Sequence, residues 1–193
     1  MQAILDRPFT PTRRRFDVDA YYRMAEVGIL SPKDRVELID GEIIEMAPIG
    51  APHGGKVDRL TSLVARIVAE GQAIARVQGP LRLDRRNEPQ PDLMLLRSRA
   101  DFYESGHPTA ADVLLLVEVA DSSLAYDRGP KLALYARHGV PEVWIVDLRG
   151  RTVDVCRQPG PGGYAEQRSV VTGELTPVLV PTLRIDVSAL IGA

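Results

Sequence analysis

The sequence predicts an α+β protein built on a mixed β-sheet, and three observations support this class. Residues 113–147 read as strand, helix and strand, the pattern of a right-handed parallel crossover. In VELIDGEIIEM, the Asp40-Gly41 dipeptide separates two short apolar runs, which indicates a β-hairpin. Nearer the C-terminus, RTVDVCR and GYAEQRSVV flank the turn-rich loop QPGPGG, which is typical of two more short strands.

Length and composition describe an ordinary globular protein. A chain of 193 residues buries roughly 70% of its unfolded surface, enough for a real core in one domain. With 45% hydrophobic and 26% charged residues, it has no uncharged apolar stretch of about 18 residues to span a membrane. A net charge of -2 argues against tight binding to nucleic acid through overall charge. Any such partner has to be bound by a local patch.

The N-terminal third predicts an arm, a helix and a hairpin before the longest helix. We expect residues 1–15, which end in three arginines, to be a flexible arm, with a single domain over 16–193. The arm begins apolar and turns basic, the reverse of a secretory signal, so we expect a cytoplasmic protein. Asp17 is a suitable N-cap for a helix. After the hairpin, apolar residues at helical spacing predict a long amphipathic helix over 55–70.

The middle of the chain predicts the strands of the sheet. We expect strands over 73–78, 80–84 and 91–96, and a short helix within 98–105 before the apolar strand VLLLVEVA. The crossover helix begins with Asp127 as its cap and Pro130 in its first turn. The strand VWIVD follows, and TLRIDV is the last strand before a brief terminal helix. Cys156, a lone cysteine, reads as a small buried hydrophobe.

Two acidic residues at the ends of apolar strands carry the chemistry. Glu118 closes an otherwise aliphatic run, and a carboxylate taken out of water is costly unless a cation or several hydrogen bonds meet it. Asp92 opens another apolar strand, 118 minus 92 or 26 residues earlier. If the two strands are neighbours, both carboxylates can share Mg²⁺, which is often held by one or two carboxylates plus waters and phosphate. Lys131, on the following helix, can point to the same corner and orient a water or balance a phosphate.

These residues carry a resemblance to a known family. The Pro91-Asp92 pair, the VEV around Glu118 and the whole segment VEVADSSLAYDRGPKLALYARHGVPEVWIVD resemble the Uma-type restriction endonuclease family of the PD-(D/E)XK nuclease superfamily. The run VELIDGEIIEMAP, with His53 and a long helix after it, resembles the opening of the same family. The resemblance covers roughly residues 16–190. It implies a restriction-endonuclease-like core and an endonuclease that cleaves DNA with Mg²⁺, or with Mn²⁺ as a substitute. It also points to a homodimer.

The resemblance also implies roles for individual residues. Asp92 and Glu118 would be the metal-binding acids, and the backbone carbonyl of Val119 a further ligand. The superfamily motif has lysine two residues after the glutamate, where this chain has Ala120. In the family that the chain resembles, a lysine on the following helix is thought to substitute, which corresponds to Lys131.

Three further residues accompany this core set. By the resemblance, Glu37 would support metal binding. Gln90 precedes the Pro91-Asp92 pair and lies where it can hydrogen-bond substrate or water. His53 is a second candidate for substrate binding, although a histidine between Pro52 and Gly54 also suits a loop or helix cap.

Structural interpretations of the same residues stay open. Glu118 can form a purely structural ion pair with Lys131 or with an arginine. Lys131 can instead pair with Asp127, four residues earlier on the helix. Asp92 can be a turn residue at a strand start. Glu37 alternates with apolar neighbours and can face solvent.

The sequence leaves two rival functions open. Ala120 and the net acidity fit a nuclease fold that has lost turnover and serves as a DNA-binding or protein-assembly module. A carboxylate pair can also hydrolyse a non-phosphate substrate by general acid and base catalysis, which needs no metal.

Overall fold

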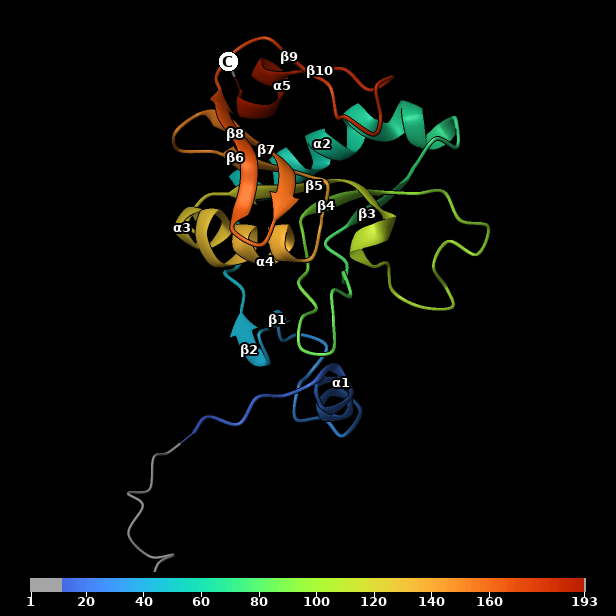
Figure 1. The fold of residues 1–193 in the computed structure, drawn as a ribbon, viewed down its shortest axis with the longest axis vertical. Helices are drawn as coiled ribbons and strands as arrows, with labels where there is room; N and C mark the ends of the chain where they lie inside the picture. Colours follow the sequence, from blue (N-terminus) through green and yellow to red (C-terminus); the bar gives the residue numbers. More distant parts are fainter. Residues whose placement is uncertain (1–11, 193) are drawn as a thin grey trace, which may run out of the picture.

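A computed structural model describes residues 12–192, and its centre is a six-stranded sheet (Figure 1). The sheet order is β3-β4-β5-β6-β7-β8. The strands are β3 (Ile74–Val77), β4 (Leu93–Leu96), β5 (Val113–Ala120), β6 (Glu142–Asp147), β7 (Thr152–Gly160) and β8 (Gly163–Val170). β5 and β6 run parallel, and the other neighbouring strands run antiparallel. The predicted α+β class with a mixed sheet and a parallel crossover is confirmed.

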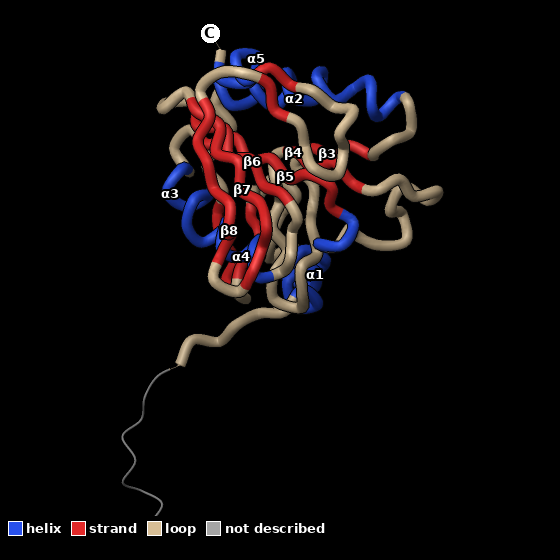
Figure 2. The backbone as a smooth tube through the Cα atoms, turned by 45° about the horizontal axis from the view of Figure 1, so that its top comes forward, coloured by secondary structure: helices blue, strands red, loops and turns tan. Residues whose placement is uncertain are grey.

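Helices cover both faces of this sheet (Figure 2). On one face lie α2 (Ala51–Ala69) and α5 (Val187–Ile191), and on the other lie α3 (Leu124–Tyr126), the π-helical turn η2 (Asp127–Lys131) and α4 (Leu132–Arg137). Successive strand residues face opposite sides. In β4, Leu93 and Leu95 pack toward α2 whereas Met94 and Leu96 pack toward α4. An even-numbered residue extending β4 therefore faces the α4 side.

The N-terminal helix and hairpin lie below the sheet, beyond α4 (Figure 1). They are α1 (Val18–Glu26), β1 (Val36–Ile39) and β2 (Glu42–Glu45). Asp17 caps α1 by accepting from the Ala20 amide at 2.9 Å, as predicted. Leu38 in β1 pairs with Glu88 in the loop before β4, with 2.8 Å between the Glu88 nitrogen and the Leu38 oxygen. This bridge attaches the hairpin to the core.

The longest helix starts earlier than the sequence predicted. α2 begins at Ala51 rather than at 55, with Pro52 in its first turn. Proline is tolerated there because the first amides of a helix have no partner within the helix. The early start places His53 in the first turn of α2, rather than in a loop ahead of it.

Two predicted elements before the crossover are absent. Residues 80–84 form no ladder strand and contain only the isolated bridge between Asp84 and Asn87. Leu81 is fully buried on the α4 side, so packing explains the apolar pattern that predicted a strand. Residues 98–105 form turns instead of a helix, because Phe102 and Tyr103 have φ values of 47° and 65°. A single 3-10 turn, η1 (Ala110–Asp112), precedes β5.

The crossover helix also begins before its predicted cap. Helical backbone starts at Leu124, so Asp127 lies inside the helix, where its carboxylate accepts from the Ser123 hydroxyl at 2.6 Å. The predicted N-cap role of Asp127 is wrong. Pro130 lies within the π turn, and because proline has no amide hydrogen it cannot complete the regular i to i−4 pattern.

The C-terminal strands differ from their predicted lengths. β7 and β8 continue into the predicted loop QPGPGG, where Pro159 pairs with Tyr164. The predicted strand over 182–187 contracts to β10 (Ile185–Asp186), which pairs with β9 (Glu174–Leu175). Of the predicted arm over 1–15, residues 1–11 lie outside the described residues. Within the described part of the chain, no helix combines the length and the apolarity that crossing a membrane requires.

The hairpin turn gives a test of how the N-terminal segment packs. Gly41 has a φ of 73°, and a Cβ there would lie 2.8 Å from both the Cβ of Arg15 and the carbonyl oxygen of Phe16. We expect Gly41→Ala to lower the free energy of unfolding by about 2–4 kcal/mol, from backbone strain plus the clash. Urea unfolding measures this loss. The matched control is Gly28→Ala, where φ is 77° and no atom lies within 4 Å, so only the strain remains. Equal losses would show that the contact with Phe16 is unimportant.

Candidate functional site

The register between β4 and β5 brings the two predicted acids together. Leu93 pairs with Val117, so one step outward in this antiparallel ladder Asp92 lies opposite Glu118. Glu118 is met from the α4 side by Lys131 and Tyr135, whereas Asp92 is met by His53 at the start of α2. The Val119 amide donates to Oδ2 of Asp92 at 2.8 Å, and the Asp92 amide lies 3.4 Å from Oε2 of Glu118. Each acid is thus held by the backbone of the opposing strand.

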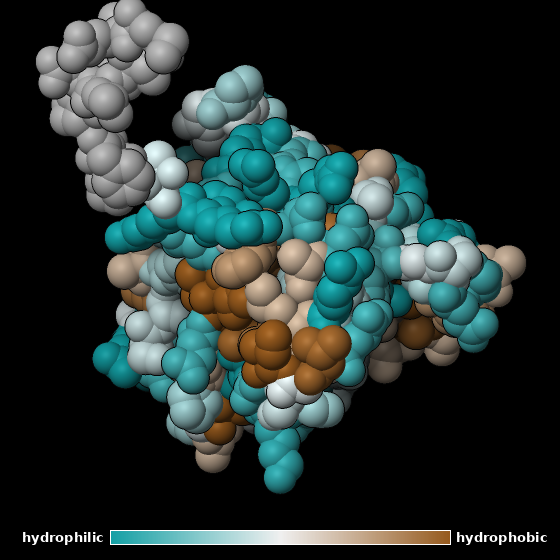
Figure 3. Space-filling view, turned by 90° about the horizontal axis from the view of Figure 1, so that it is seen from below, coloured by the Kyte–Doolittle hydropathy of each residue, from teal (hydrophilic) through white to brown (hydrophobic). Residues whose placement is uncertain are grey.

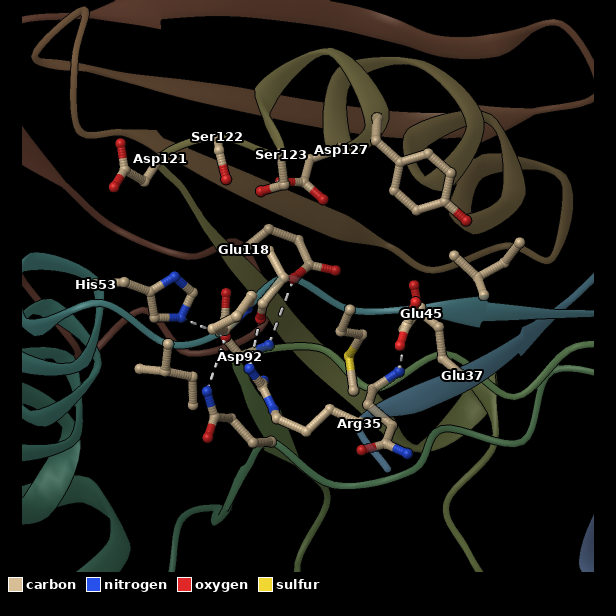
Figure 4. Close-up of a pocket in the computed structure, with 18 of the residues that line it drawn as sticks. Arg35, Glu37, Glu45, His53, Asp92, Glu118, Asp121, Ser122, Ser123 and Asp127 are labelled. Atoms are coloured by element: carbon tan, nitrogen blue, oxygen red, sulfur yellow. Dashed lines mark hydrogen bonds and ion pairs between the residues drawn. The ribbon is translucent and has the colours of Figure 1, made fainter. Parts of the chain in front are cut away.

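A pocket of about 500 Å³ opens onto this pair (Figure 4). Its walls come from β1 and the segment after β2, from the start of α2, and from the turn between β5 and α3. Figure 4 shows Asp92 and Glu118 at the centre, with His53 on one side and Glu37 on the other. All six residues whose side chains the sequence proposed line this pocket: Glu37, His53, Gln90, Asp92, Glu118 and Lys131.

Glu118 is buried, and two side chains meet its carboxylate. Oε1 accepts from the ammonium of Lys131 at 2.8 Å and from the hydroxyl of Tyr135 at 2.6 Å. Burial raises the pKa of Glu118 to about 8, against the opposing effect of Lys131. The ion pair that the sequence left open between Glu118 and Lys131 is therefore present.

Lys131 ends the π turn and is itself buried, with its side chain 6% exposed. Its ammonium lies 2.8 Å from Glu118 and 3.5 Å from Oε2 of Glu37. Burial lowers the pKa of Lys131, but the carboxylates of Glu118, Glu37 and Asp127 outweigh this effect, and the pKa is raised. Lys131 is therefore a cation at neutral pH. Its ion-pair contacts are with Glu118 and Glu37, and the alternative of an i, i+4 pair with Asp127 is not formed.

Glu37 and Gln90 connect the hairpin to this centre. Glu37 is only 2% exposed, so the alternative that it faces solvent is wrong. Its Oε2 accepts from the Gln90 amide nitrogen at 3.0 Å, and the Gln90 side-chain amide donates to the Val36 carbonyl at 3.1 Å. Gln90 therefore fixes β1 against the start of β4, with its side-chain nitrogen already bonded to protein.

Asp92 has a different environment from Glu118. Its Oδ1 lies 2.9 Å from Nε2 of His53 and accepts from the Gln78 amide at 3.2 Å. Burial raises the pKa of Asp92, but hydrogen bonding to His53 and to the Val119 amide outweighs it, so the pKa is lowered. Hydrogen bonding to Asp92 in turn raises the pKa of His53. The two carboxyls thus have opposite pKa shifts, lowered for Asp92 and raised for Glu118.

The donor set suits a hard cation that keeps other ligands. Among residues 12–192, no group of three or more histidine, cysteine, aspartate and glutamate side chains is gathered closely enough to hold a metal by itself. Mg²⁺ requires less, because one or two carboxylates suffice when waters and phosphate complete its shell. Oδ2 of Asp92 and Oε2 of Glu118 each accept one backbone amide, which leaves a lone pair on each oxygen. The pair fits Mg²⁺ on this ground.

The sequence missed several residues of the pocket. Gln78 follows β3 and supports Asp92, although nothing in its local pattern indicated this contact. Tyr135 does not line the pocket but is buried behind it on α4, and its hydroxyl donates to Glu118. Arg35 and Tyr126 also line the pocket. The polar run Asp121 to Ser123 directly after a buried strand was the one signal that could have been followed.

A carboxylate pair on adjacent strands of a mixed sheet, with a lysine from the crossover helix, defines a restriction-endonuclease-like protein. A family model described as "Uma2: Putative restriction endonuclease" matches residues 18–188, and the chain belongs to this family. The predicted family is therefore confirmed.

A solved structure among those that match has a similar fold over most of the chain. It is the crystal structure of a "putative nuclease belonging to DUF820" from Anabaena variabilis ATCC 29413. The match covers 91% of this chain and 97% of that chain, with a TM-score of 0.71 and 17% sequence identity. At this identity the likeness shows the fold. No curated protein matches the chain.

The raised pKa of Glu118 predicts a pH-dependent stability in buffer with a chelator. A carboxyl whose pKa is about 8 in the folded protein and near 4.5 when unfolded stabilises the fold fully below pH 4.5. That contribution is lost as pH rises to 8. We expect the stability of the wild type relative to Glu118→Gln to fall by a few kcal/mol across this range. Chemical unfolding at several pH values measures it. Glu174→Gln, which changes a 52% exposed side chain, is the matched control. If the unfolding free energies of the wild type and of Glu118→Gln change with pH in parallel, the raised pKa of Glu118 is refuted.

Proposed function

We propose that the protein is a Mg²⁺-dependent DNA endonuclease that hydrolyses phosphodiester bonds with a metal-activated water. The observation that carries this proposal is the meeting of Asp92 and Glu118 across β4 and β5, with the Lys131 ammonium 2.8 Å from Glu118. The family description and the nuclease-like fold support the same chemistry. Mn²⁺ is the expected substitute ion.

Asp92 and Glu118 would hold the ion, with Glu37 supporting them through its contact with Lys131. The Val119 carbonyl is a further candidate ligand. The Val119 amide donates to Asp92. Because the N–H and C=O of one strand residue point to the same side, the Val119 carbonyl points toward the Asp92 side as well. When bound, Mg²⁺ lowers the pKa of a coordinated water and polarises the scissile phosphate.

The electrostatics of the pocket favour a cation before an anionic substrate. Its lining contains more carboxylates than cationic side chains: Glu37, Glu45, Asp92, Glu118, Asp121 and Asp127, against Arg35 and Lys131. A phosphate entering this field alone would be repelled. A divalent ion between the acids reverses the local field, which is why we assign the acids to metal rather than to direct contact with DNA.

Lys131 acts on the water and the phosphate. Its ammonium has three donors, of which Glu118 and Glu37 take two. The third donor can orient the attacking water at the edge of the acid pair. His53 holds Oδ1 of Asp92, which fixes the orientation of that carboxylate. A role for His53 or Gln90 in touching substrate stays a prediction.

The rival functions are separable from this proposal. An inactive nuclease fold was motivated by Ala120, but Lys131 supplies an ammonium beside Glu118 from the neighbouring helix. This contact favours an active enzyme. A metal-free hydrolase that uses the carboxylate pair would keep its activity in a chelator, whereas the nuclease would lose it.

Nicking of supercoiled plasmid with Mg²⁺ or Mn²⁺ tests the proposal. We expect Asp92→Ala and Glu118→Ala each to lower the cleavage rate at least about a hundredfold, because each removes a metal-binding carboxylate. Lys131→Met should lower the rate while Mn²⁺ still binds in calorimetry. The control is Asp58→Asn, an exposed position on α2 outside the pocket. Cleavage that survives both alanine substitutions, or that proceeds in EDTA, would exclude this mechanism.

Self-association and cytoplasmic location stay predictions. One face of the molecule carries an apolar area bordered by hydrophilic side chains (Figure 3). Exposed apolar side chains follow α1, where Val27 is 66% and Ile29 is 69% exposed. Such surface favours association with another copy of the chain. Sedimentation analysis should give the mass of a dimer, and a monomer at all accessible concentrations would contradict the expectation.

A further inference from the structure

The pocket contains a hydrogen-bond donor that no residue in the described part of the chain uses. The hydroxyl of Tyr126 is buried and has no hydrogen-bond partner among residues 12–192. Buried polar groups almost always have partners, since leaving one unpaired carries the full cost of removing it from water. Tyr126 is among the residues that line the pocket. Its hydroxyl can be satisfied by a group that enters the pocket.

The surroundings of Tyr126 define which group that is. Burial and the carboxylate of Glu37 raise the pKa of Tyr126 to about 12, with Lys131 opposing them. The hydroxyl thus stays protonated at neutral pH and lies in the field of the same charges that surround Glu118. A neutral donor at this place suits an acceptor-only partner such as a phosphate oxygen.

A second donor comes from the hairpin side of the pocket. The guanidinium of Arg35 donates to the Ala47 carbonyl at 2.6 Å, and within the described residues it makes no ion pair. Its charge acts on His53, so it lies toward the Asp92 end of the acid pair. Guanidinium has five N–H donors in a fork that matches phosphate, and this single contact leaves most of them available.

Other donors of the same kind are used elsewhere in the protein. The Tyr135 hydroxyl is bonded to Glu118, and Arg157 is bonded to the buried Glu142. Arg128 pairs with Asp154 on the sheet. At the pocket, by contrast, Tyr126 from α3 and Arg35 from the start of the hairpin have donors to spare.

We infer that the Tyr126 hydroxyl and the Arg35 guanidinium hold the oxygens of the substrate phosphate, from the Lys131 side and the His53 side of the acid pair. This inference rests on the proposed nuclease function and names two residues that contact its substrate. In the proposed mechanism the acids would hold the metal, and these two donors would hold the phosphate that the activated water attacks.

The substitution Tyr126→Phe separates substrate contact from a structural role. We expect Tyr126→Phe to lower kcat for DNA cleavage on the order of tenfold to a hundredfold, with Mn²⁺ affinity unchanged. Its free energy of unfolding should equal or exceed that of the wild type, because the hydroxyl has no partner to lose. The matched control is Thr152→Val, which removes the other unpartnered buried hydroxyl, at a position outside the pocket. It should leave kcat unchanged.

The proposed contact of Arg35 with phosphate is tested through the salt dependence of KM for DNA. We expect Arg35→Gln to raise KM for DNA and to reduce the slope of log KM against log salt by about one, the value for one lost phosphate contact. Arg97→Gln is the control, because Arg97 is exposed and also donates to a backbone carbonyl, that of Ala111, outside the pocket. If the wild type cleaves DNA and both Tyr126→Phe and Arg35→Gln show wild-type kinetics, the inference is overturned. The proposed nuclease function would still stand.

Inorganic phosphate gives a readout that does not need turnover. In Mn²⁺, millimolar phosphate should raise the Tm of the wild type, and this shift should be lost in Tyr126→Phe and Arg35→Gln but retained in Thr152→Val and Arg97→Gln. If the wild type does not cleave DNA, the proposed function fails, and this titration still decides whether the two residues bind phosphate. Equal shifts in all variants would refute the contact.

Discussion

The structure depends on the burial of one carboxylate in an aliphatic strand. Glu118 is taken out of water on β5, and its charge is tolerated because Lys131 and Tyr135 reach it from the crossover helix. That requirement fixes the rotation of the helix, and the π turn around Pro130 sets the position of Lys131 on it. The hairpin is drawn into the same network, since Glu37 is the second partner of Lys131. The contacts around one buried carboxylate thus link β5, the crossover helix and the hairpin.

Two carboxylates that lie opposite each other have opposite pKa shifts. Asp92 accepts from a histidine, an amide side chain and a backbone amide, which together stabilise its charge. For Glu118, burial outweighs its partners and raises the pKa to about 8. Such divergence is common where proton and metal chemistry occur. In the proposed enzyme, Asp92 is ready to bind a cation at neutral pH, while Glu118 gains full charge when a cation is close.

The superfamily motif has a lysine two residues after the glutamate, where this chain has Ala120, and the ammonium beside Glu118 belongs to Lys131 instead. Ala120 packs into the core on the α4 side, and the ammonium comes from a residue on the helix that covers this face. The parallel β5–β6 crossover makes this possible, because it lays α4 over the strand that carries Glu118. An ammonium therefore reaches Glu118 from a helix that packs on the strand rather than from the strand itself.

The sequence by itself determined the class, the hairpin, the crossover and the acids, because these follow from local patterns. A glutamate in an aliphatic strand needs a partner wherever it lies, and Asp40-Gly41 suits a hairpin turn because both residues adopt positive φ, 50° and 73°. Only the tertiary structure decided the register of Asp92 against Glu118, the contacts of Gln78 and Tyr135, and the unpaired Tyr126 hydroxyl. It also replaced the predicted elements over 80–84 and 98–105 with loops. The physical reason is that register, partner choice and loop packing depend on contacts between residues far apart in the chain, which no local pattern encodes.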